Sequence, residues 1–210
     1  MYAPTDQRGQ SKLKILQQLI PNTPALPIGQ FSMIVADPPW SYNLRETDAT
    51  HRGRCPYPSM TDAQIKTMPV GAIAAEQAYL LLWTTNNHLR LAFEVVDTWG
   101  FEYKALHTWV KTTKVGDKIR FGIGHYGRNC TEHLLICRKG NAPSFTALGL
   151  TDIPTAFHAP PCAHSEKPEA FYGMAERLAE ALGGDRIELF ARQARPGWQV
   201  WGAESGREKC

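Results

Sequence analysis

Short apolar runs recur along the chain, separated by segments with helical spacing or by turn residues. Runs of this kind, rich in branched and aromatic residues, are typical of buried strands. They predict strands at 31–36, 79–83, 103–110, 131–138 and 186–191, with a short last strand at 199–201. Because helical segments lie between several of these runs, the pattern predicts an α/β fold built on a mainly parallel sheet.

Three helices are marked by residues that favour helix ends. A capping-box pattern at 61–64 starts the first of them. One of the asparagines at 86–87 is expected to cap the second, which ends at Gly100. Pro168 is expected in the first turn of the third helix, which the glycines at 183–184 close.

Length and composition indicate one ordinary globular domain. The chain has 210 residues, of which 43% are hydrophobic and 20% are charged, so it can bury a sizeable core. We place the domain at 30–204, after a polar, proline-containing lead-in at 1–29 and before a tail at 205–210. Neither a Gly-x-Gly-x-x-Gly motif nor a Walker lysine loop occurs, so a nucleotide-phosphate cradle is not indicated. The net charge of +3 permits a nucleic-acid partner but does not require one.

The apolar runs are all too short to span a bilayer. The first segment, residues 1–14, is polar and lacks the apolar centre of a signal peptide. We therefore expect a cytoplasmic protein with no membrane partner.

The five cysteines do not form a recognisable framework. Their number is odd and no Cys-x-x-Cys pair occurs, which argues against a set of disulfides or a zinc knuckle. Cys130, His133 and Cys137 lie close in sequence, but on a strand Cys130 and His133 would point to opposite faces. Their spacing also matches no known ligand motif. We expect reduced thiols and no bound metal.

The segment after the first predicted strand, Asp37-Pro38-Pro39-Trp40, has the composition of a binding site. In open α/β sheets ligands bind at the carboxyl ends of strands, where this tetrapeptide lies. Its carboxylate and carbonyl groups accept hydrogen bonds, its prolines lack backbone donors, and Trp40 adds a flat apolar face. Such a group suits a planar ligand that donates hydrogen bonds through an amino group, as adenine does. The alternative is a proline-rich turn without function.

Two basic loops follow predicted strands and are expected to meet the tetrapeptide at the same edge of the sheet. The loop at 41–59 carries histidine, arginine and tyrosine, and the loop at 111–128 carries five basic residues against one acid, Asp117. Basic segments with interleaved aromatics suit a phosphate backbone and stacked bases. Solvated loops with ordinary surface charge are the alternative.

Lys167 precedes the predicted helix at Pro168, where the helix dipole disfavours a cation. A bound anion, such as the carboxylate of an amino-acid-like ligand, would remove this conflict. The alternative is a lysine that points into water at small cost. Arg192 and Arg195 follow the strand at 186–191 and are either ligands at its carboxyl end or surface ion-pair partners.

Taken together, these segments resemble the DPPW-type N6-adenine methyltransferases, the family of the catalytic subunit of the eukaryotic messenger-RNA adenosine methyltransferase. The resemblance runs from about residue 31 to residue 204. Besides the tetrapeptide, the segments that carry it are Tyr57-Pro58-Ser59-Met60, Leu80-Leu81-Leu82-Trp83, Trp109-Val110-Lys111, Gly124-His125-Tyr126, Glu132-His133, His164-Ser165-Glu166-Lys167-Pro168, Phe171-Tyr172-Gly173-Met174 and Ile187-Glu188-Leu189-Phe190-Ala191-Arg192. This chain departs from the family pattern at Trp201-Gly202-Ala203-Glu204, where members commonly have Trp-Gly-Asn-Glu.

The resemblance implies a Rossmann-like fold that uses S-adenosylmethionine, in a permuted order with the catalytic strand before the cofactor strand. It implies that the tetrapeptide holds the target amino group, Lys167 the methionine carboxylate and Arg192 the cofactor ribose. The residues expected to be catalytic are Asp37, Pro38, Pro39 and Trp40. Those expected to bind the cofactor are Asp37, Tyr57, Lys167, Glu188, Phe190, Arg192 and Arg195. Those expected to bind the substrate are Tyr42, Arg52, Arg54, Lys111, Lys118, Arg120, His125 and Arg128.

The expected reaction is methylation of the adenine amino group in DNA. Asp37 and the Pro38 carbonyl would accept the two N–H bonds, and Trp40, Tyr42 or Tyr57 would stack on the base. DNA is preferred as substrate because the chain shows no added RNA-binding module. An RNA adenosine methyltransferase or a catalytically silent nucleic-acid-binding relative are the alternatives. A homodimer or a partner subunit is open, since members of the family commonly depend on partners.

Overall fold

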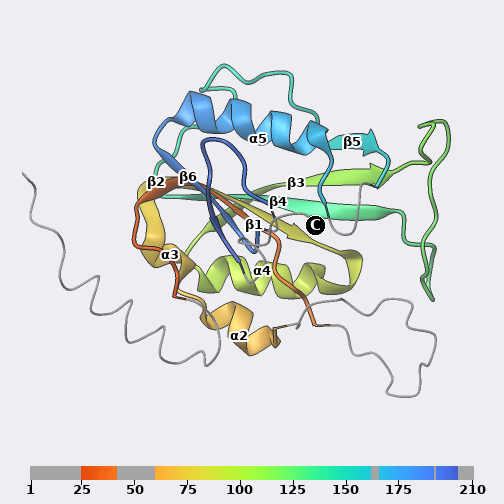
Figure 1. The fold of residues 1–210 in the computed structure, drawn as a ribbon, viewed down its shortest axis with the longest axis horizontal. Coiled ribbons are helices and arrows are strands. Elements are labelled where there is room, and N and C mark those ends of the chain that lie inside the picture. The colour runs from red at the N-terminus through yellow and green to blue at the C-terminus, as the bar shows by residue number, and fades with distance from the viewer. Residues whose placement is uncertain (1–24, 42–59, 162–165, 192, 203–210) are drawn as a thin grey trace, which may run out of the picture.

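The computed structural model describes residues 25–41, 60–161, 166–191 and 193–202, and these form three layers with a central sheet (Figure 1). The strands, in chain order, are β1 (Phe31–Ala36), β2 (Ala74–Thr84), β3 (Glu102–Lys111), β4 (Thr131–Lys139), β5 (Ala156–Ala159), β6 (Asp185–Leu189) and β7 (Gln199–Trp201). The helices are α2 (Asp62–Thr67), α3 (Val70–Ile73), the 3-10 helix η1 (Asn86–His88), α4 (Leu89–Thr98) and α5 (Glu169–Leu182).

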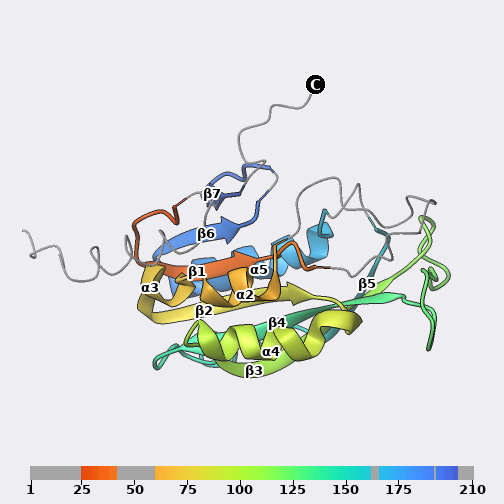
Figure 2. The ribbon, with the colours of Figure 1, turned by 90° about the horizontal axis from the view of Figure 1, so that it is seen from below.

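The seven strands form one sheet in the order β5-β3-β4-β2-β1-β6-β7. β1 pairs in parallel with both β2 and β6, β6 with β7, and β3 with β5. Only β4 runs the other way, antiparallel to β2 and β3. Six strands therefore point in one direction, and Figure 2 shows their carboxyl ends gathered along one edge. The predicted α/β fold with a mainly parallel sheet is confirmed.

Each face of the sheet is covered by a helical layer, because successive strand residues point to opposite faces. On one face Ile34 and Leu80 pack against α2 and α4. On the other face Met33 and Leu81 pack against α5. Figure 1 shows α5 above the sheet and α2 and α4 below it. β1 is buried along its whole length, which explains why its sequence is a continuous apolar run.

The predicted helices are present, with corrections at their starts. Thr61 and Gln64 form the predicted capping box of α2. Neither asparagine caps α4, whose N-cap is His88, because η1 precedes it and Asn86 instead bonds to Thr131 across the sheet edge. Pro168 is the N-cap of α5 and lies just outside its first turn.

Two short elements were not predicted from the sequence. β5 lies at the sheet edge and is half exposed, so it lacks an apolar run and exists through its pairing with β3. The single-turn helix α3 is set by burial of Val70 and Ile73 under the sheet. β6 is shorter than predicted, since Phe190 has a φ of 64° that ends the strand.

Within the described ranges, no helix is long and apolar enough to cross a membrane. The same residues contain no group of three or more histidine, cysteine or acidic side chains arranged to hold a metal. Cys137 is buried in the sheet, and burial raises the pKa of its thiol to about 12.

Candidate active site

The strand order places a crevice between the ends of β1 and β6. The strand that follows β1 in the chain lies on one side of this pair, and the strand that follows β6 lies on the other. Ligands of open α/β sheets bind at such a reversal of strand order, outside the carboxyl ends. Asp37 follows β1 here, with Ala36 in register with Leu82 and Leu189 of the neighbouring strands.

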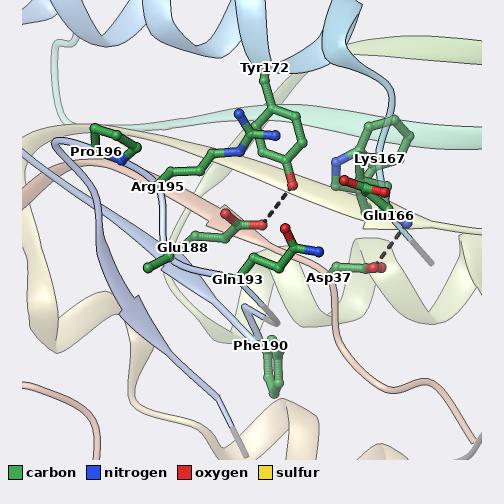
Figure 3. Close-up of a pocket in the computed structure, with 11 residues that line it drawn as sticks. Asp37, Glu166, Lys167, Tyr172, Glu188, Phe190, Gln193, Arg195 and Pro196 are labelled. Atoms are coloured by element: carbon green, nitrogen blue, oxygen red, sulfur yellow. Dashed lines mark hydrogen bonds and ion pairs between the residues drawn. The ribbon is translucent and has the colours of Figure 1, made fainter. Parts of the chain in front are cut away.

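A pocket opens at this crevice, between the sheet edge and the start of α5 (Figure 3). Its volume of about 250 Å³ is slightly below the range of about 300–1,000 Å³ that is usual for small-molecule sites. It combines acidic, basic, amide and aromatic side chains from both ends of the sequence. The lining residues are Asp37, Trp83, Glu166, Lys167, Tyr172, Glu188, Phe190, Gln193, Ala194, Arg195 and Pro196.

Lys167 is the central cation of the pocket. Its side chain is 8% exposed, and its Nζ lies 2.9 Å from Asp37 Oδ2 and 2.9 Å from Glu132 Oε2. The same ammonium lies over the ring of Trp83, 4.8 Å from the centroid. Burial alone would lower the pKa of this ammonium, but Asp37 and then Glu132 outweigh burial and raise the pKa of Lys167. The side chain is therefore a fixed positive charge at the end of β1.

The ion pairs continue from the pocket to the end of β3. Glu132 Oε1 lies 2.5 Å from the Nζ of Lys111, which stands over the ring of Trp109. Burial would raise the pKa of Glu132, but Lys167 and Lys111 together lower it. The result is a chain of alternating charges, Lys111–Glu132–Lys167–Asp37, that joins β3, β4, the start of α5 and β1.

A second polar cluster lies on the α5 side of the pocket. The Tyr172 hydroxyl donates a hydrogen bond to Glu188 Oε1 over 3.1 Å, and the Arg195 guanidinium lies over the Tyr172 ring. Burial raises the pKa of Glu188, although the Tyr172 hydrogen bond and Arg195 oppose the rise. Burial likewise raises the pKa of the Tyr172 phenol. Figure 3 shows the Tyr172 hydroxyl and the Glu188 carboxyl group next to each other in the pocket.

The tetrapeptide 37–40 is held in a tight turn. The Trp40 amide donates to the Pro38 carbonyl over 2.8 Å, and the Met60 amide donates to the Pro39 carbonyl over 3.1 Å. The Trp40 indole donates to the Trp83 carbonyl over 3.1 Å and stacks on His88, and the residue as a whole is only 6% exposed. His88 Nε2 lies 2.9 Å from the Ser41 carbonyl, and since a carbonyl only accepts, this nitrogen carries the proton.

The burial of Trp40 corrects one part of the expected chemistry. Its ring packs against His88 inside the core cluster, so it has no exposed face on which a base could stack. Trp40 instead fixes the turn that presents Asp37 and the Pro38 carbonyl. The two other aromatic residues expected to stack on the base, Tyr42 and Tyr57, lie outside the described residues.

The structure brings part of the predicted site together. Asp37, Lys167, Glu188, Phe190 and Arg195 line one pocket, and Lys111 reaches the same cluster through Glu132. The other described basic residues that were predicted to belong to the site are exposed on the segment between β3 and β4 and do not line the pocket; they are Lys118, Arg120, His125 and Arg128. The predicted site residues that lie outside the described ranges are Tyr42, Arg52, Arg54, Tyr57 and Arg192.

Several residues of the site received no role from the sequence. Glu132 reads as an ordinary strand residue, and its position between two lysines emerges only when β3, β4 and α5 meet. Tyr172 lies on the buried face of a helix, where an aromatic residue is usually core. His88 and Gln193 carry no local motif. The only indication in the sequence that Glu132 and Tyr172 belong to the site is that they lie in segments shared with the methyltransferase family.

Comparison with known proteins decides the family. The model of the family described as MT-A70 matches residues 31–204. The chain belongs to this family. Among curated members and relatives, it is 30% identical over 197 residues to the Type II methyltransferase M.MunI of Mycoplasma sp, covering 86% of this chain and 80% of that protein. It is 32% identical over 178 residues to the human N(6)-adenosine-methyltransferase catalytic subunit METTL3, covering 83% of this chain.

This MT-A70 chain spans most of M.MunI but only about a quarter of the N(6)-adenosine-methyltransferases that it matches. It covers 28% of human METTL3 and 22% of a probable N(6)-adenosine-methyltransferase of Oryza sativa subsp. japonica, to which it is 33% identical over 174 residues. The predicted family and the predicted methyltransferase class are confirmed. Methyltransferases of this kind use S-adenosylmethionine as methyl donor in general.

Proposed function

We propose that this chain transfers a methyl group from S-adenosylmethionine to the N6 amino group of adenine in DNA. The observation that carries the proposal is the ion pair between Asp37 and Lys167, which joins a proposed substrate acceptor to a proposed cofactor anchor in one pocket. Similarity to a Type II methyltransferase along 80% of its length favours DNA. The family match supports N6-adenine chemistry.

The donor set of the pocket fits S-adenosylmethionine. An ammonium has three N–H donors, and Lys167 directs two at Asp37 and Glu132, which leaves one for the ligand's carboxylate. Glu188 and Gln193 supply groups that bind hydroxyls and amines, and Phe190 supplies an apolar surface. Arg195 lies beside them, while Tyr57 and Arg192 complete the proposed set from segments outside the described residues. When bound, S-adenosylmethionine would supply the methyl group as an electrophile on its sulfonium and would leave as the neutral thioether.

Asp37 and the Pro38 carbonyl would orient the adenine amine. Its lone pair is delocalised into the ring, so it attacks well only when its two N–H bonds are held by acceptors. A carboxylate has about four acceptor sites and a carbonyl has two, so each of these groups can accept more than one hydrogen bond at the same time. Positioning and electrostatics then drive the transfer. The methylated nitrogen loses one proton to solvent only after the methyl group has been transferred, so Asp37 acts as a hydrogen-bond acceptor without being a strong base.

The charges behind Asp37 would keep this geometry fixed. Lys167 holds the carboxylate from one side, and Glu132 holds Lys167 from the other. Because these groups are already oriented in the folded protein, little reorganisation is needed when the substrate arrives. In a duplex the base must first leave the stack, which costs a few kcal/mol.

Asp37→Ala tests the proposal. We expect kcat for transfer of labelled methyl groups to DNA to fall by about 100-fold or more, because one of two acceptors for the amine is gone. The fold should persist, since Lys167 keeps its pair with Glu132. Asp152→Ala is the matched control, because it removes a carboxylate whose partner, Arg177, lies on the surface. Near-normal activity of Asp37→Ala would refute this mechanism.

RNA is the second candidate substrate. The chain is 32% identical to a protein named as an N(6)-adenosine-methyltransferase, over 83% of its own length. The same labelled assay with RNA and DNA strands of matched sequence separates the two. Higher kcat/KM on RNA would replace DNA by RNA in the proposed function and leave the role of Asp37 unchanged.

A further inference from the structure

The segment between β3 and β4, residues 112–130, projects as an arm from the edge of the sheet (Figure 2). Of the seven large hydrophobic residues exposed in the described part of the chain, five lie on it. Phe121 is 63% exposed, Ile123 is 68% exposed and Tyr126 is fully exposed. Clustered exposed apolar residues mark interaction surfaces, whereas scattered ones need no explanation.

The arm keeps its shape without packing these side chains. The Arg120 amide donates to the Lys111 carbonyl, and the Gly122 amide donates to the Asn129 carbonyl over 2.6 Å. The Arg128 and Asn129 side chains bond to the carbonyls of Gly122 and Ile123. These bonds hold the outgoing and returning halves of the arm against each other. The apolar side chains therefore remain available for a partner.

The close approach of the two halves near the tip of the arm depends on a glycine, Gly124. A Cβ on Gly124 would lie 2.0 Å from the Gly127 carbonyl oxygen, which no side chain tolerates. The tip that carries Tyr126 is therefore narrow, because the backbone at Gly124 lies directly against the backbone at Gly127. A narrow tip with exposed apolar side chains has the form of a wedge.

The charge of the arm favours a nucleic acid as its partner. The segment carries Lys114, Lys118, Arg120 and Arg128 against the single acid Asp117. It follows β3, which points in the same direction as β1, so the arm leaves the edge of the sheet where Asp37 lies. Basic side chains suit phosphates, and apolar side chains suit the faces of bases. A nucleic acid bound at Asp37 would meet both on this arm.

We propose that Phe121, Ile123 and Tyr126 form a wedge that enters duplex DNA beside the target adenine and holds the stack open. Apolar side chains inserted between base steps unstack and kink a duplex in this way. The wedge would offset part of the cost of extruding the adenine toward Asp37. This inference rests on the proposed function, because it assumes that the substrate is a nucleic acid, and it adds that the substrate is a duplex.

The test compares duplex and single-stranded substrates. Labelled methyl transfer is measured on plasmid DNA and on the same DNA after heat denaturation. The variants are Phe121→Ala/Ile123→Ala and Tyr126→Ala. Ile28→Ala is the matched control, because Ile28 is also 68% exposed and precedes β1 at the opposite edge of the sheet. We expect the arm variants to lower kcat/KM on the duplex by about 10-fold or more and on single strands by less than about 2-fold, since single strands need no extrusion.

A second readout does not depend on methylation. In duplexes with 2-aminopurine in place of scattered adenines, the unaltered protein should raise the fluorescence as a base unstacks, and the arm variants should not. Equal losses on both substrates, or no loss on the duplex, would overturn the wedge. So would a change from dimer to monomer in sedimentation, which would assign the arm to a second copy. Absence of methylation by the unaltered protein, with 2-aminopurine fluorescence still rising, would refute the proposed function and keep the wedge.

Discussion

At the scale of single residues, Lys167 explains why the site is charged as it is. A lysine before the N-terminus of a helix is unfavourable, because the helix dipole places partial positive charge there. The sequence therefore suggested a bound anion. The structure supplies two carboxylates of the protein itself, Asp37 and Glu132, each 2.9 Å from Nζ. An anionic ligand would join this cluster, so substitutions that change the charges around Lys167 test how the site is held together.

Glu132→Gln removes one of these charges, and its effect can be measured as a change in the free energy of unfolding. Because Lys167 and Lys111 lower the pKa of Glu132 below its ordinary value of 4.5, the ionised side chain stabilises the fold above this value. That stability is lost as the pH falls through the lowered pKa. We expect the variant to lose about 1–3 kcal/mol of unfolding free energy at neutral pH. The difference from the unaltered protein should shrink below pH 4.5, as measured by urea unfolding at each pH.

The control is Glu102→Gln, which removes a carboxylate that pairs with Lys104 and Arg138 at the surface. Exposed pairs contribute little, so this variant should behave like the unaltered protein at every pH. A Glu132→Gln defect that stays constant between neutral and acidic pH would contradict the role given to the charge of Glu132.

At the scale of elements, the turn after β1 depends on an indole. Trp40 donates to the Trp83 carbonyl at the end of β2, and this bond ties the tetrapeptide to the neighbouring strand. Trp40→Phe removes the bond and keeps an apolar ring. We expect a loss of about 1–2 kcal/mol of unfolding free energy. We also expect kcat to fall by about 10-fold, because the acceptors of the amine move with the turn.

Trp99→Phe separates the two effects. The Trp99 indole donates to the Ile65 carbonyl over 2.9 Å, is buried like Trp40, and caps the far end of α4. Its loss should cost similar stability in chemical unfolding and leave kcat unchanged in the labelled assay. Equal falls in kcat for both variants would show that general destabilisation, and not the turn, limits activity.

The same elements show how far sequence alone reaches. Strands with continuous apolar runs, such as β1, were predicted at their correct positions, because burial on both faces leaves a plain signal. β5 was missed, since its strand conformation comes from pairing with β3 and not from its own residues. In the site, Asp37 was found from local composition. Glu132 was given no role, because its two lysine partners come from distant parts of the chain.

At the scale of the whole molecule, the pocket and the arm lie at the same edge of the sheet, because β1 and β3 point in the same direction. The net charge of +3 is small, so attraction to nucleic acid must come from where the charges lie. Lys118 and Arg120 are exposed on the arm, on the same side as the proposed substrate site. By contrast, Lys104 and Arg177 pair with Glu102 and Asp152 elsewhere on the surface.

This distribution predicts a specific salt dependence. Each phosphate contact adds about 0.9 to the slope of log K against log salt concentration for duplex DNA. Lys118→Gln/Arg120→Gln should therefore reduce the slope by about 1.8, measured by fluorescence anisotropy between about 50 and 200 mM salt. Lys104→Gln/Arg177→Gln changes the net charge equally and should leave the slope nearly unchanged. If both pairs lowered the slope alike, binding would follow net charge, and the arm would not be the phosphate-binding surface.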